Sequence, residues 1–435
     1  MIHPIIPILI ALLYFIVRHI LHGLRNIVWL MNGTWRLVKE SRKEENYERS
    51  AHVLSIAGRY RYDSVALSTR LRDFILYHDG FIHPEYVLRD EVTLYHIDRR
   101  QAVFVECADG DTPWRLDDHS FSRDGQYRKA ERVIVLPIRS AYRLAEKLGR
   151  PAGKLVFIGN IARCGSTLLS QAFEKTGHFV NYTEPGAISD LIDCTDVQDA
   201  EARQHVSATV SLLCKSRLNG PPVEGHVVKI MATVTGVVPM LHSLFPNAYY
   251  LFLYRHHLAS MKSLASLTPM LPFAYLQQFL DRWFPALARR HAIYQKFASK
   301  DRSVEDCRLD TLTPKSFIIT KILAPTFVFH HCLENGIDMP AFRYEDLAES
   351  PRPTLGAIFS YCDISEKYLD EALKSMEVDS QEKSMLSRKN TTKKKMKPIF
   401  GDEDVKLIRE LCRQNGIPDV LDYPILKGTT LIEAK

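Results

Sequence analysis

The stretch LVFIGNIARCGSTLLSQAF, residues 155–173, decides the fold of this chain of 435 residues. An apolar run ends at Gly159, a turn carries Arg163 and Gly165, and Ser166 begins an amphipathic segment. This pattern predicts a strand, a loop and a helix. A Walker loop has the form G-x-x-x-x-G-K-[ST], but here no lysine follows the second glycine and the glycines stand one residue too far apart.

The predicted loop has the chemistry of an anion site. The first amides of a helix have no partner within the helix and point outward. Gly165 lets the backbone approach an anion closely, and the hydroxyls of Ser166 and Thr167 add hydrogen bonds at the positive end of the helix dipole. Arg163 places a fixed positive charge where a leaving oxygen would develop negative charge. Taken alone, the stretch also fits an ordinary strand-turn-helix with a capping serine.

A second stretch, NAYYLFLYRHHLASMKSLASL at residues 247–267, repeats the pattern of a strand that runs into a helix. Arg255 ends the strand and Ser263 follows eight residues later, about two helical turns, so both are expected to face one anion. Other apolar runs, KLVFIGN, HVVKIMA and KSFIIT, alternate with amphipathic segments. This alternation predicts an α/β layered fold with a mainly parallel sheet, whose ligands collect beyond the carboxyl ends of the strands.

The two motifs, RCGST from Arg163 to Thr167 and RHHLASMKS from Arg255 to Ser263, resemble those of the sulfotransferases. These enzymes move a sulfuryl group from 3'-phosphoadenosine 5'-phosphosulfate (PAPS) to a hydroxyl or amine. The resemblance covers about residues 153–412 and implies a P-loop-type three-layer fold. The family's usual RDP or RNP at the second site is replaced here, which loosens that turn. The residues that the resemblance assigns to PAPS in these motifs are Arg163, Cys164, Gly165, Ser166, Thr167, Leu168, Arg255 and Ser263.

Further segments resemble the family in the same order. Lys229 resembles the second-strand lysine that faces the transferring group, but the Thr-His that follows it in the cytosolic branch is absent. Glu184 in NYTEPGAISDL resembles the glutamate that membrane-bound Golgi tyrosyl-protein and carbohydrate sulfotransferases place near the acceptor. Arg388 and Lys389 resemble the basic loop that closes over the nucleotide. The segment FRYEDLAESP, residues 342–351, resembles a family segment that we interpret as structural.

The resemblance implies catalytic roles for Arg163, Glu184 and Lys229 and requires no metal. An acceptor hydroxyl would lose its proton to Glu184 as it attacks sulfur, while Arg163 and Lys229 stabilise the departing phosphate. A carboxyl with an ordinary pKa of ~4.3 is a weak base, so desolvation has to raise its pKa or bond-making has to run late. A structural glutamate and a strand-end lysine are the alternatives for these two residues.

Two other functions stay open at this stage. A degenerate sulfotransferase-fold protein would bind a phosphonucleotide without transferring anything. A P-loop nucleotide kinase would need the missing Walker lysine and a magnesium-binding carboxylate at a strand end. The predicted partners are an acceptor glycan, protein or small hydroxyl compound, and a membrane. Nucleic acid is not predicted, because the basic run at residues 387–397 lacks interleaved aromatic side chains.

The remaining chain divides into four predicted segments. Residues 1–31 are apolar and predict a membrane helix, as an anchor of either orientation or as an interfacial helix; a helix buried against the body is the alternative. Residues 32–59 form a charged stem. Residues 60–150 contain EVTLYHI, QAVFVEC and ERVIVLPI between turn-like segments such as SRDGQ, which predicts a small β-rich accessory region. Residues 151–435 form the sulfotransferase-like domain.

Bulk composition adds little to these assignments. The net charge of +6 is spread over 57 basic and 51 acidic residues, so local clusters matter more than the total. The eight cysteines include no C-x-x-C pair, which excludes a zinc ribbon or thioredoxin-type motif and favours buried free thiols. The family resemblance places the protein in the Golgi membrane with a luminal catalytic domain. Arg18 and Arg25, which follow the apolar run, oppose that orientation and leave a cytosolic one open.

Overall fold

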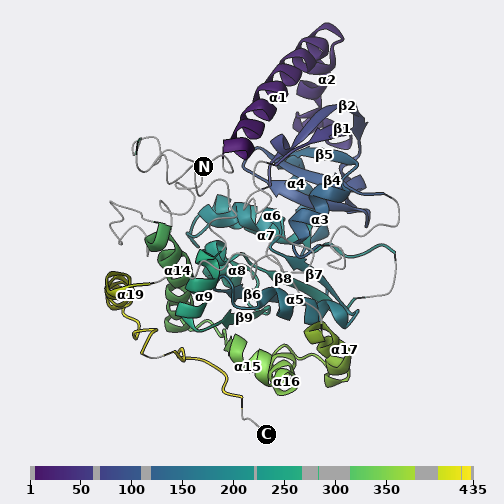
Figure 1. Cartoon of the computed structure of the whole chain (residues 1–435). Helices are drawn as coiled ribbons and strands as arrows, with labels where there is room; N and C mark the ends of the chain where they lie inside the picture. The colour runs from purple at the N-terminus through teal and green to yellow at the C-terminus, as the bar shows by residue number, and fades with distance from the viewer. Residues whose placement is uncertain are drawn as a thin grey trace.

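The computed structural model describes residues 5–61, 69–108, 119–219, 223–266, 283, 314–377, 400–422 and 424–432. Within these residues the chain forms two five-stranded sheets (Figure 1). Sheet A contains β1 (Ala51–Arg59), β2 (Phe74–Ile82), β3 (Val92–Ile97), β4 (Gln101–Glu106) and β5 (Arg132–Pro137). Sheet B contains β6 (Lys154–Asn160), β7 (Phe179–Thr183), β8 (Gly225–Lys229), β9 (Tyr249–Tyr254) and β10 (Ala341–Arg343).

Sheet A is antiparallel, with the strand order β2-β1-β5-β4-β3. Alternate side chains of its strands are buried on opposite faces, as the pleat requires. Val103 and Val105 of β4 join the smaller hydrophobic cluster, which includes Trp29, whereas Phe104 joins the main core. Burial on both faces explains the nearly continuous apolar runs. The first strand, β1, lies within residues 32–59, for which the sequence suggests a charged stem.

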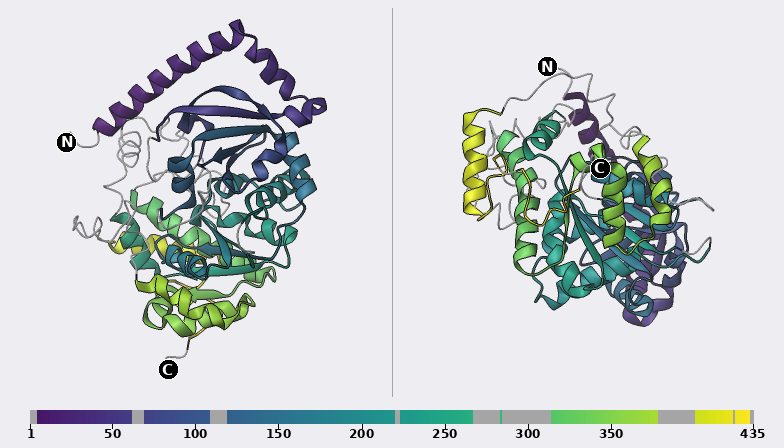
Figure 2. Two further views of the ribbon diagram at one scale, coloured as in Figure 1. Left: turned by 90° about the vertical axis from the view of Figure 1, so that its right-hand side faces the viewer. Right: turned by 90° about the horizontal axis from the view of Figure 1, so that it is seen from below.

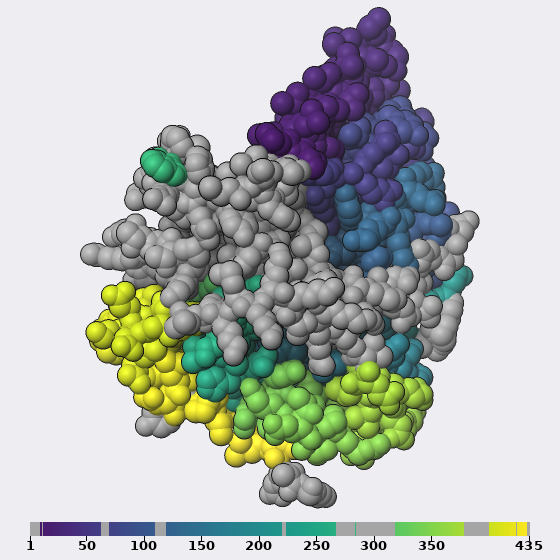
Figure 3. All heavy atoms as spheres, viewed as in Figure 1, coloured from purple at the N-terminus to yellow at the C-terminus, as the bar shows by residue number. Residues whose placement is uncertain are grey.

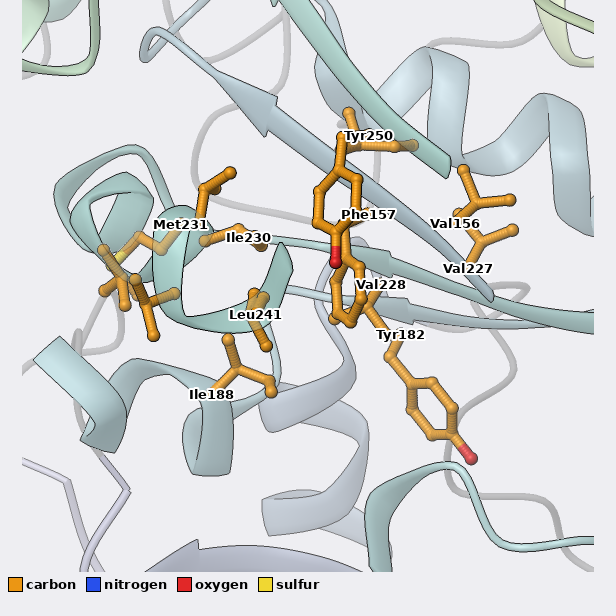
Figure 4. Packing of buried hydrophobic residues seen from close by; sticks show 14 of the residues in the cluster. Val156, Phe157, Tyr182, Ile188, Val227, Val228, Ile230, Met231, Leu241 and Tyr250 are labelled. Carbon is orange, nitrogen blue, oxygen red and sulfur yellow. The ribbon is translucent and has the colours of Figure 1, made fainter. Parts of the chain in front are cut away.

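Sheet B has the order β10-β9-β6-β8-β7, and all four of its strand pairings are parallel. The predicted α/β class with a mainly parallel sheet is therefore confirmed. Its central strands are apolar on both faces because helices lie on either side of the sheet (Figures 1 and 2). Phe157 of β6 stacks on Tyr250 of β9, with ring centroids 5.4 Å apart, and Val228 lies beside them (Figure 4).

One predicted strand is wrong. The run KSFIIT lies inside α14 (Pro314–Glu334), a helix of 21 residues. The run is short and apolar, which suggests a strand, but buried side chains continue beyond it at Ile322 and Leu323, three to four residues after Ile318 and Ile319. That spacing is helical and dominates once the neighbouring segment is included.

The other helices fall into groups along the chain. Before and within sheet A lie α1 (Ile5–Met31), α2 (Thr34–Ser41), α3 (Ser122–Lys129) and α4 (Ile138–Leu148), with 3-10 helices at Glu44–Arg49, Leu71–Asp73 and Pro84–Leu88. Around sheet B lie α5 (Ser166–Lys175), α6 (Gly186–Ser189), α7 (Ala200–Leu213), α8 (Val238–Leu244) and α9 (His257–Ala265), with 3-10 helices at Asp190–Asp193 and Ala232–Val237. The C-terminal part contains α15 (Tyr344–Glu349), α16 (Pro351–Tyr361), α17 (Leu369–Leu373) and α19 (Asp402–Gln414), with 3-10 helices at Glu366–Tyr368 and Lys374–Glu377.

The N-terminal segment forms a helix, as predicted from its apolar composition. Gly33 separates α1 from α2 with a φ of 78°. The two helices meet at a bend and lie as an inverted V over sheet A (Figure 2). Over the described residues, no helix combines the length and the apolar character needed to cross a bilayer. This finding does not support the predicted membrane-spanning helix.

Buried polar contacts join sheet A to the sheet B unit, which comprises sheet B and the helices around it from β6 onward. His96 Nδ1 of β3 lies 2.5 Å from Asp190 Oδ2, which also accepts a hydrogen bond from Ile97 N at 3.2 Å. Lys215 Nζ, just after α7, donates to the carbonyl of Val87 at 2.8 Å. Asp90 accepts backbone hydrogen bonds from residues 218 and 219. The accessory region is therefore packed directly against the elements that carry the predicted site.

Candidate functional site

The loop between β6 and α5 has the strand-loop-helix form that its sequence predicts. Gly165 is the N-cap of α5 with a φ of 81°, and Arg163 has a φ of 65°. A Cβ on Gly165 would lie 2.4 Å from the ring of Tyr344, so only glycine fits there. Because the N-cap has no side chain, the alternative of a capping serine is wrong. The N-terminus of α5 keeps the features of an anion site.

Hydrogen bonds to neighbouring strands fix this loop. Cys164 Sγ donates to the carbonyl of Leu253 in β9 at 3.2 Å. Asn160 Nδ2 donates to the carbonyl of Ile230 at 2.6 Å, and its Oδ1 accepts from Ser166 Oγ at 3.1 Å. Burial raises the pKa of the Cys164 thiol to about 11, so it remains a neutral donor. The side chain of Cys164, a residue that the family resemblance places in the PAPS loop, anchors this loop to β9.

The two predicted anion motifs meet through their side chains. Arg163 Nε donates to Ser263 Oγ of α9 at 3.1 Å, which joins the loop after β6 to the helix after β9. Arg255 directly follows β9, at the strand end where the sequence predicts it, and its guanidinium lies 4.9 Å from the ring centroid of Tyr344. The Tyr344 ring therefore lies between Gly165 and Arg255. The structure brings Ser263 to the arginine of the first motif, whereas Arg255 contacts an aromatic ring in the segment that we interpreted as structural.

Glu184 and Lys229 meet because β7 and β8 are adjacent parallel strands. Thr183 pairs with Lys229 in the register, and Glu184 N donates to the carbonyl of Lys229 at 2.9 Å. Lys229 Nζ lies 2.6 Å from Glu184 Oε1 and 3.3 Å from Thr167 Oγ1 of α5. Glu184 has a φ of 50°, which non-glycine residues rarely adopt and which is often found at functional sites. The lysine thus links the anion loop to the predicted base.

Arg123 is a charged residue of this cluster that no motif in the sequence indicates. Its Nη1 donates to Glu184 Oε2 at 2.7 Å, and the residue is only 1% exposed. The preceding Ser122 accepts a hydrogen bond from Thr183 N at 2.7 Å, which docks α3 on the edge strand β7. The guanidinium of Arg123 also lies 4.6 Å from the ring centroid of Phe121. A residue of the accessory region therefore completes the surroundings of Glu184.

The segment SRDGQ, predicted as a turn, forms the beginning of α3. Its glycine and aspartate suggest a turn, but tertiary contacts favour the helix. Gln126 is 1% exposed, and its Nε2 donates to the carbonyl of Leu94 at 2.9 Å. No local pattern reveals such contacts, so the position of Arg123 could not be read from the sequence.

The electrostatics of Glu184 differ from the expectation for a base with a raised pKa. Burial alone would raise its pKa, but the ammonium of Lys229 and the guanidinium of Arg123 outweigh burial and lower the pKa to about 2. The Glu184 side chain is 14% exposed, while those of Lys229 and Arg123 are 3% and 2% exposed. A carboxylate base needs either a raised pKa or late bond-making, and in this arrangement the pKa of Glu184 is not raised. Late bond-making is the condition that remains.

The remaining predicted residues are less informative. Leu168 is half-buried in the first turn of α5, and its amide donates to the carbonyl of Gly165 at 2.9 Å. Arg388 and Lys389 lie outside the described residues. The seven cysteines in the described part of the chain are all buried, as the sequence suggests for its thiols.

Comparisons with known proteins give little further information. No protein-family model matches the chain, and no curated protein matches its sequence. Among solved structures, the chain is similar to a sulfotransferase domain from the curacin biosynthetic pathway, with a TM-score of 0.30 and 14% sequence identity. That match covers 62% of this chain and 99% of the domain. A similarity of this degree carries no argument about fold or function.

Proposed function

We propose that this protein is a PAPS-dependent sulfotransferase with a P-loop-type fold. The observation that carries the proposal is the convergence of the anion-binding side chains on one edge of sheet B. Arg163 bonds to Ser263, and Lys229 reaches Thr167, all beyond the carboxyl ends of parallel strands. Parallel sheets bind ligands at this edge because the loops that follow their strands meet there.

The charge of the site fits a donor with several negative charges. Lys229 and Arg123 lie around a single carboxylate, Glu184, and Lys229 also reaches Thr167 in the first turn of α5. A neutral ligand would leave this excess positive charge unbalanced, whereas a phosphosulfate would balance it. The loop from Arg163 to Leu168 would hold the 5'-phosphosulfate, and Arg255 with Ser263 would hold the 3'-phosphate. The pair Arg388 and Lys389 would close over the nucleotide.

PAPS, when bound, supplies the sulfuryl group. Lys229, held in place by Glu184, and Arg163 stabilise the negative charge on the departing phosphate oxygen. The acceptor oxygen forms its bond to sulfur as the sulfur–phosphate oxygen bond breaks, and the acceptor proton passes to Glu184. Because two cations lower the pKa of Glu184, this proton moves late, when the acceptor oxygen has lost most of its electron density to sulfur. Arg123 holds the second carboxylate oxygen of Glu184.

The acceptor is proposed only as a hydroxyl on a glycan, a protein or a small compound. A carboxylate base follows the pattern of the Golgi tyrosyl-protein and carbohydrate enzymes, and on that basis we propose glycans and proteins as the first acceptors to test. The Golgi location remains a prediction from the sequence.

The proposal is tested by retention of the full chain on immobilised adenosine 3',5'-bisphosphate and by [35S]PAPS transfer to a panel of glycans, tyrosine peptides and small phenols. Arg255→Ala should abolish retention, and Glu184→Ala should abolish transfer. Arg352→Ala is the matched control, because Arg352 is 59% exposed and pairs with Asp370 away from the loop. This control should behave as the wild type in both assays.

The outcomes separate the three candidate functions. Retention without transfer to any acceptor would identify a degenerate protein that only binds the phosphonucleotide. Elution by ATP with Mg²⁺, but not by PAPS, would favour a nucleotide kinase. A complete lack of retention would reject both the enzyme and its degenerate form.

A further inference from the structure

The helix α1 has its polar and apolar faces in reversed positions. Its partly buried side chains are mostly polar, namely Arg18, His22, Arg25 and Asn26, and they lie beside the aromatic Tyr14, Phe15 and Trp29. Arg25 Nη1 donates to the carbonyl of Leu76 in β2 at 3.4 Å. A helix on a protein in water normally buries its apolar face and exposes its polar face. In α1 the polar stripe lies against the protein.

The opposite face of α1 is apolar and exposed. Fifteen of the twenty exposed large apolar side chains in the described part of the chain lie on α1 and α2. On α1 they run from Leu9 to Met31, and Leu30 and Met31, next to the bend between α1 and α2, are 72% and 82% exposed. Soluble proteins rarely expose contiguous apolar surface of this extent without a binding partner. In Figure 3 the N-terminal segment that contains α1 and α2, coloured purple, forms the projecting end of the molecule.

Polar atoms on the inner face make this arrangement unfavourable in water alone. The Nε atoms of Arg18 and Arg25 and the Nε2 atom of His22 are buried and have no hydrogen-bond partner among the described residues. Burying polar atoms without partners costs free energy. Rotating α1 about its axis would expose these atoms to water and bury the apolar face. An apolar medium outside the helix removes the advantage of that rotation.

Helix α2 and the residues directly after it add positive charge beside the apolar surface of α1. Trp35 and Leu37 of α2 are 44% and 54% exposed, and Arg36, Lys39 and Arg42 are exposed beside them. Residues 5–43 contain six lysines and arginines but a single acid, Glu40. Aromatic, aliphatic and basic side chains in this combination are typical of helices that lie in the interface of an anionic bilayer.

We propose that α1 and α2 form a membrane-interface surface that binds the face of an anionic lipid bilayer, with both helices lying in the membrane plane. The charge favours lipid over a second copy of the chain, because self-association through this surface would bring the two sets of basic residues together. The surface is independent of the proposed transfer reaction. It places the enzyme body, and the edge of sheet B, next to a membrane.

The experiment is co-sedimentation of the full chain with vesicles of phosphatidylcholine alone or with phosphatidylserine. Wild-type protein should bind the phosphatidylserine vesicles, and binding should weaken as salt rises. The triple variant Ile16→Asp, Ile20→Asp, Leu24→Asp should reduce the bound fraction at least tenfold, because these three exposed residues lie on the outer face. Leu431→Asp is the matched control, since Leu431 is 69% exposed but lies far from α1 in the chain.

Two further variants test the role of the basic side chains of α2 and the depth of Trp35 in the bilayer. Arg36→Gln with Lys39→Gln should reduce the preference for phosphatidylserine roughly tenfold while leaving the fold unchanged. Brominated lipids should quench the fluorescence of Trp35 from shallow positions, and Trp35→Phe should remove that signal.

Several outcomes would overturn the proposal. Stronger quenching by bromines near the bilayer centre would reject helices that lie in the membrane plane. A dimer in sedimentation velocity that dissociates in the triple variant, without vesicle binding, would show that a second copy covers the surface. A monomer that binds neither vesicle type would also reject a membrane-interface role. Because none of these variants touches the site at sheet B, a failed transfer assay would not affect the result.

Discussion

Two buried ion pairs that join the region of sheet A to that of sheet B differ in their balance of charge. Asp190, from the sheet B unit, meets His96 of β3, and both side chains are nearly fully buried, at 4% and 3% exposed. Arg123, from the accessory region, meets Glu184 beside Lys229, where the carboxylate is 14% exposed and faces two cations. The histidine has a carboxylate at each ring nitrogen, so this group carries no excess positive charge, and one of the two carboxylates, Asp98, is 39% exposed to solvent. The glutamate cluster has positive charge to spare.

This difference in charge balance distinguishes a purely structural contact from a candidate anion-binding site. A buried histidine between two carboxylates is satisfied by its protein partners alone. A carboxylate shared by two cations at the open edge of a parallel sheet leaves positive charge available for an anion. The accessory region therefore does more than pack against the body, because it contributes one of the cations.

The largest expected effect comes from removing the shared carboxylate. In Glu184→Gln the buried side chains of Lys229 and Arg123 lose their common counter-charge. We expect the free energy of unfolding to fall by about 3–5 kcal/mol in urea titrations. Glu410→Gln is the control, because Glu410 pairs with Arg413 on exposed α19, and it should leave the unfolding midpoint unchanged. Equal midpoints for the two variants would contradict a buried charge cluster.

The histidine tie should show as a pH dependence of stability. Burial alone would lower the pKa of His96, but Asp190 and Asp98 raise it to about 9, above its ordinary 6.5. Its stabilisation is then fully present below pH 6.5 and is lost as the pH rises through 9, with a total of about 3 kcal/mol. The difference in unfolding free energy between wild type and His96→Gln should shrink over this interval.

The exposed His331 provides the control for this measurement. His331→Gln should give a difference from wild type that does not change between pH 6 and pH 9. If His96→Gln behaves in the same way, the tie between the sheets does not depend on a protonated histidine.

Arg123→Met tests whether the accessory region serves the reaction or only the fold. We expect transfer to fall about 10²-fold while retention on adenosine 3',5'-bisphosphate is kept. Loss of one cation should also raise the pKa of Glu184, so the acidic limb of the pH–rate profile should move to higher pH. The control is Arg352→Met at the exposed pair with Asp370. A parallel loss of retention and transfer, with no shift of the limb, would indicate a purely structural role.

The smallest effect is expected at Cys164. Cys164→Ser keeps a donor for the carbonyl of Leu253 and should leave transfer within about threefold of the wild type. Cys164→Ala removes one of two donors to that carbonyl, since Ile161 N still donates to it at 3.2 Å, and should lower the free energy of unfolding by about 0.5–1.5 kcal/mol. A large loss of transfer in the serine variant, at unchanged stability, would mean that the thiol has a chemical role.

The sequence predicts the elements whose signals are local. The runs that form β6, β8 and β9, the start of α5 and the spacing of Arg255 and Ser263 all follow from patterns within about twenty residues. The strand expected at residues 315–320 is wrong because its helical spacing extends beyond the short apolar run. The turn expected at SRDGQ is wrong because buried contacts, and not local preference, determine α3.

By itself, the sequence determined the parallel α/β class, the glycine loop before α5, and the residues that an anion would require. Tertiary structure alone decided that Arg123 meets Glu184 across 61 positions of the chain, and that Lys229 meets the same carboxylate across 45. It therefore also decided that the pKa of Glu184 falls, since a pKa responds to charges within a few ångströms. In the same way, the sequence determined that α1 is an apolar helix, but only its packing on sheet A decided which face it exposes.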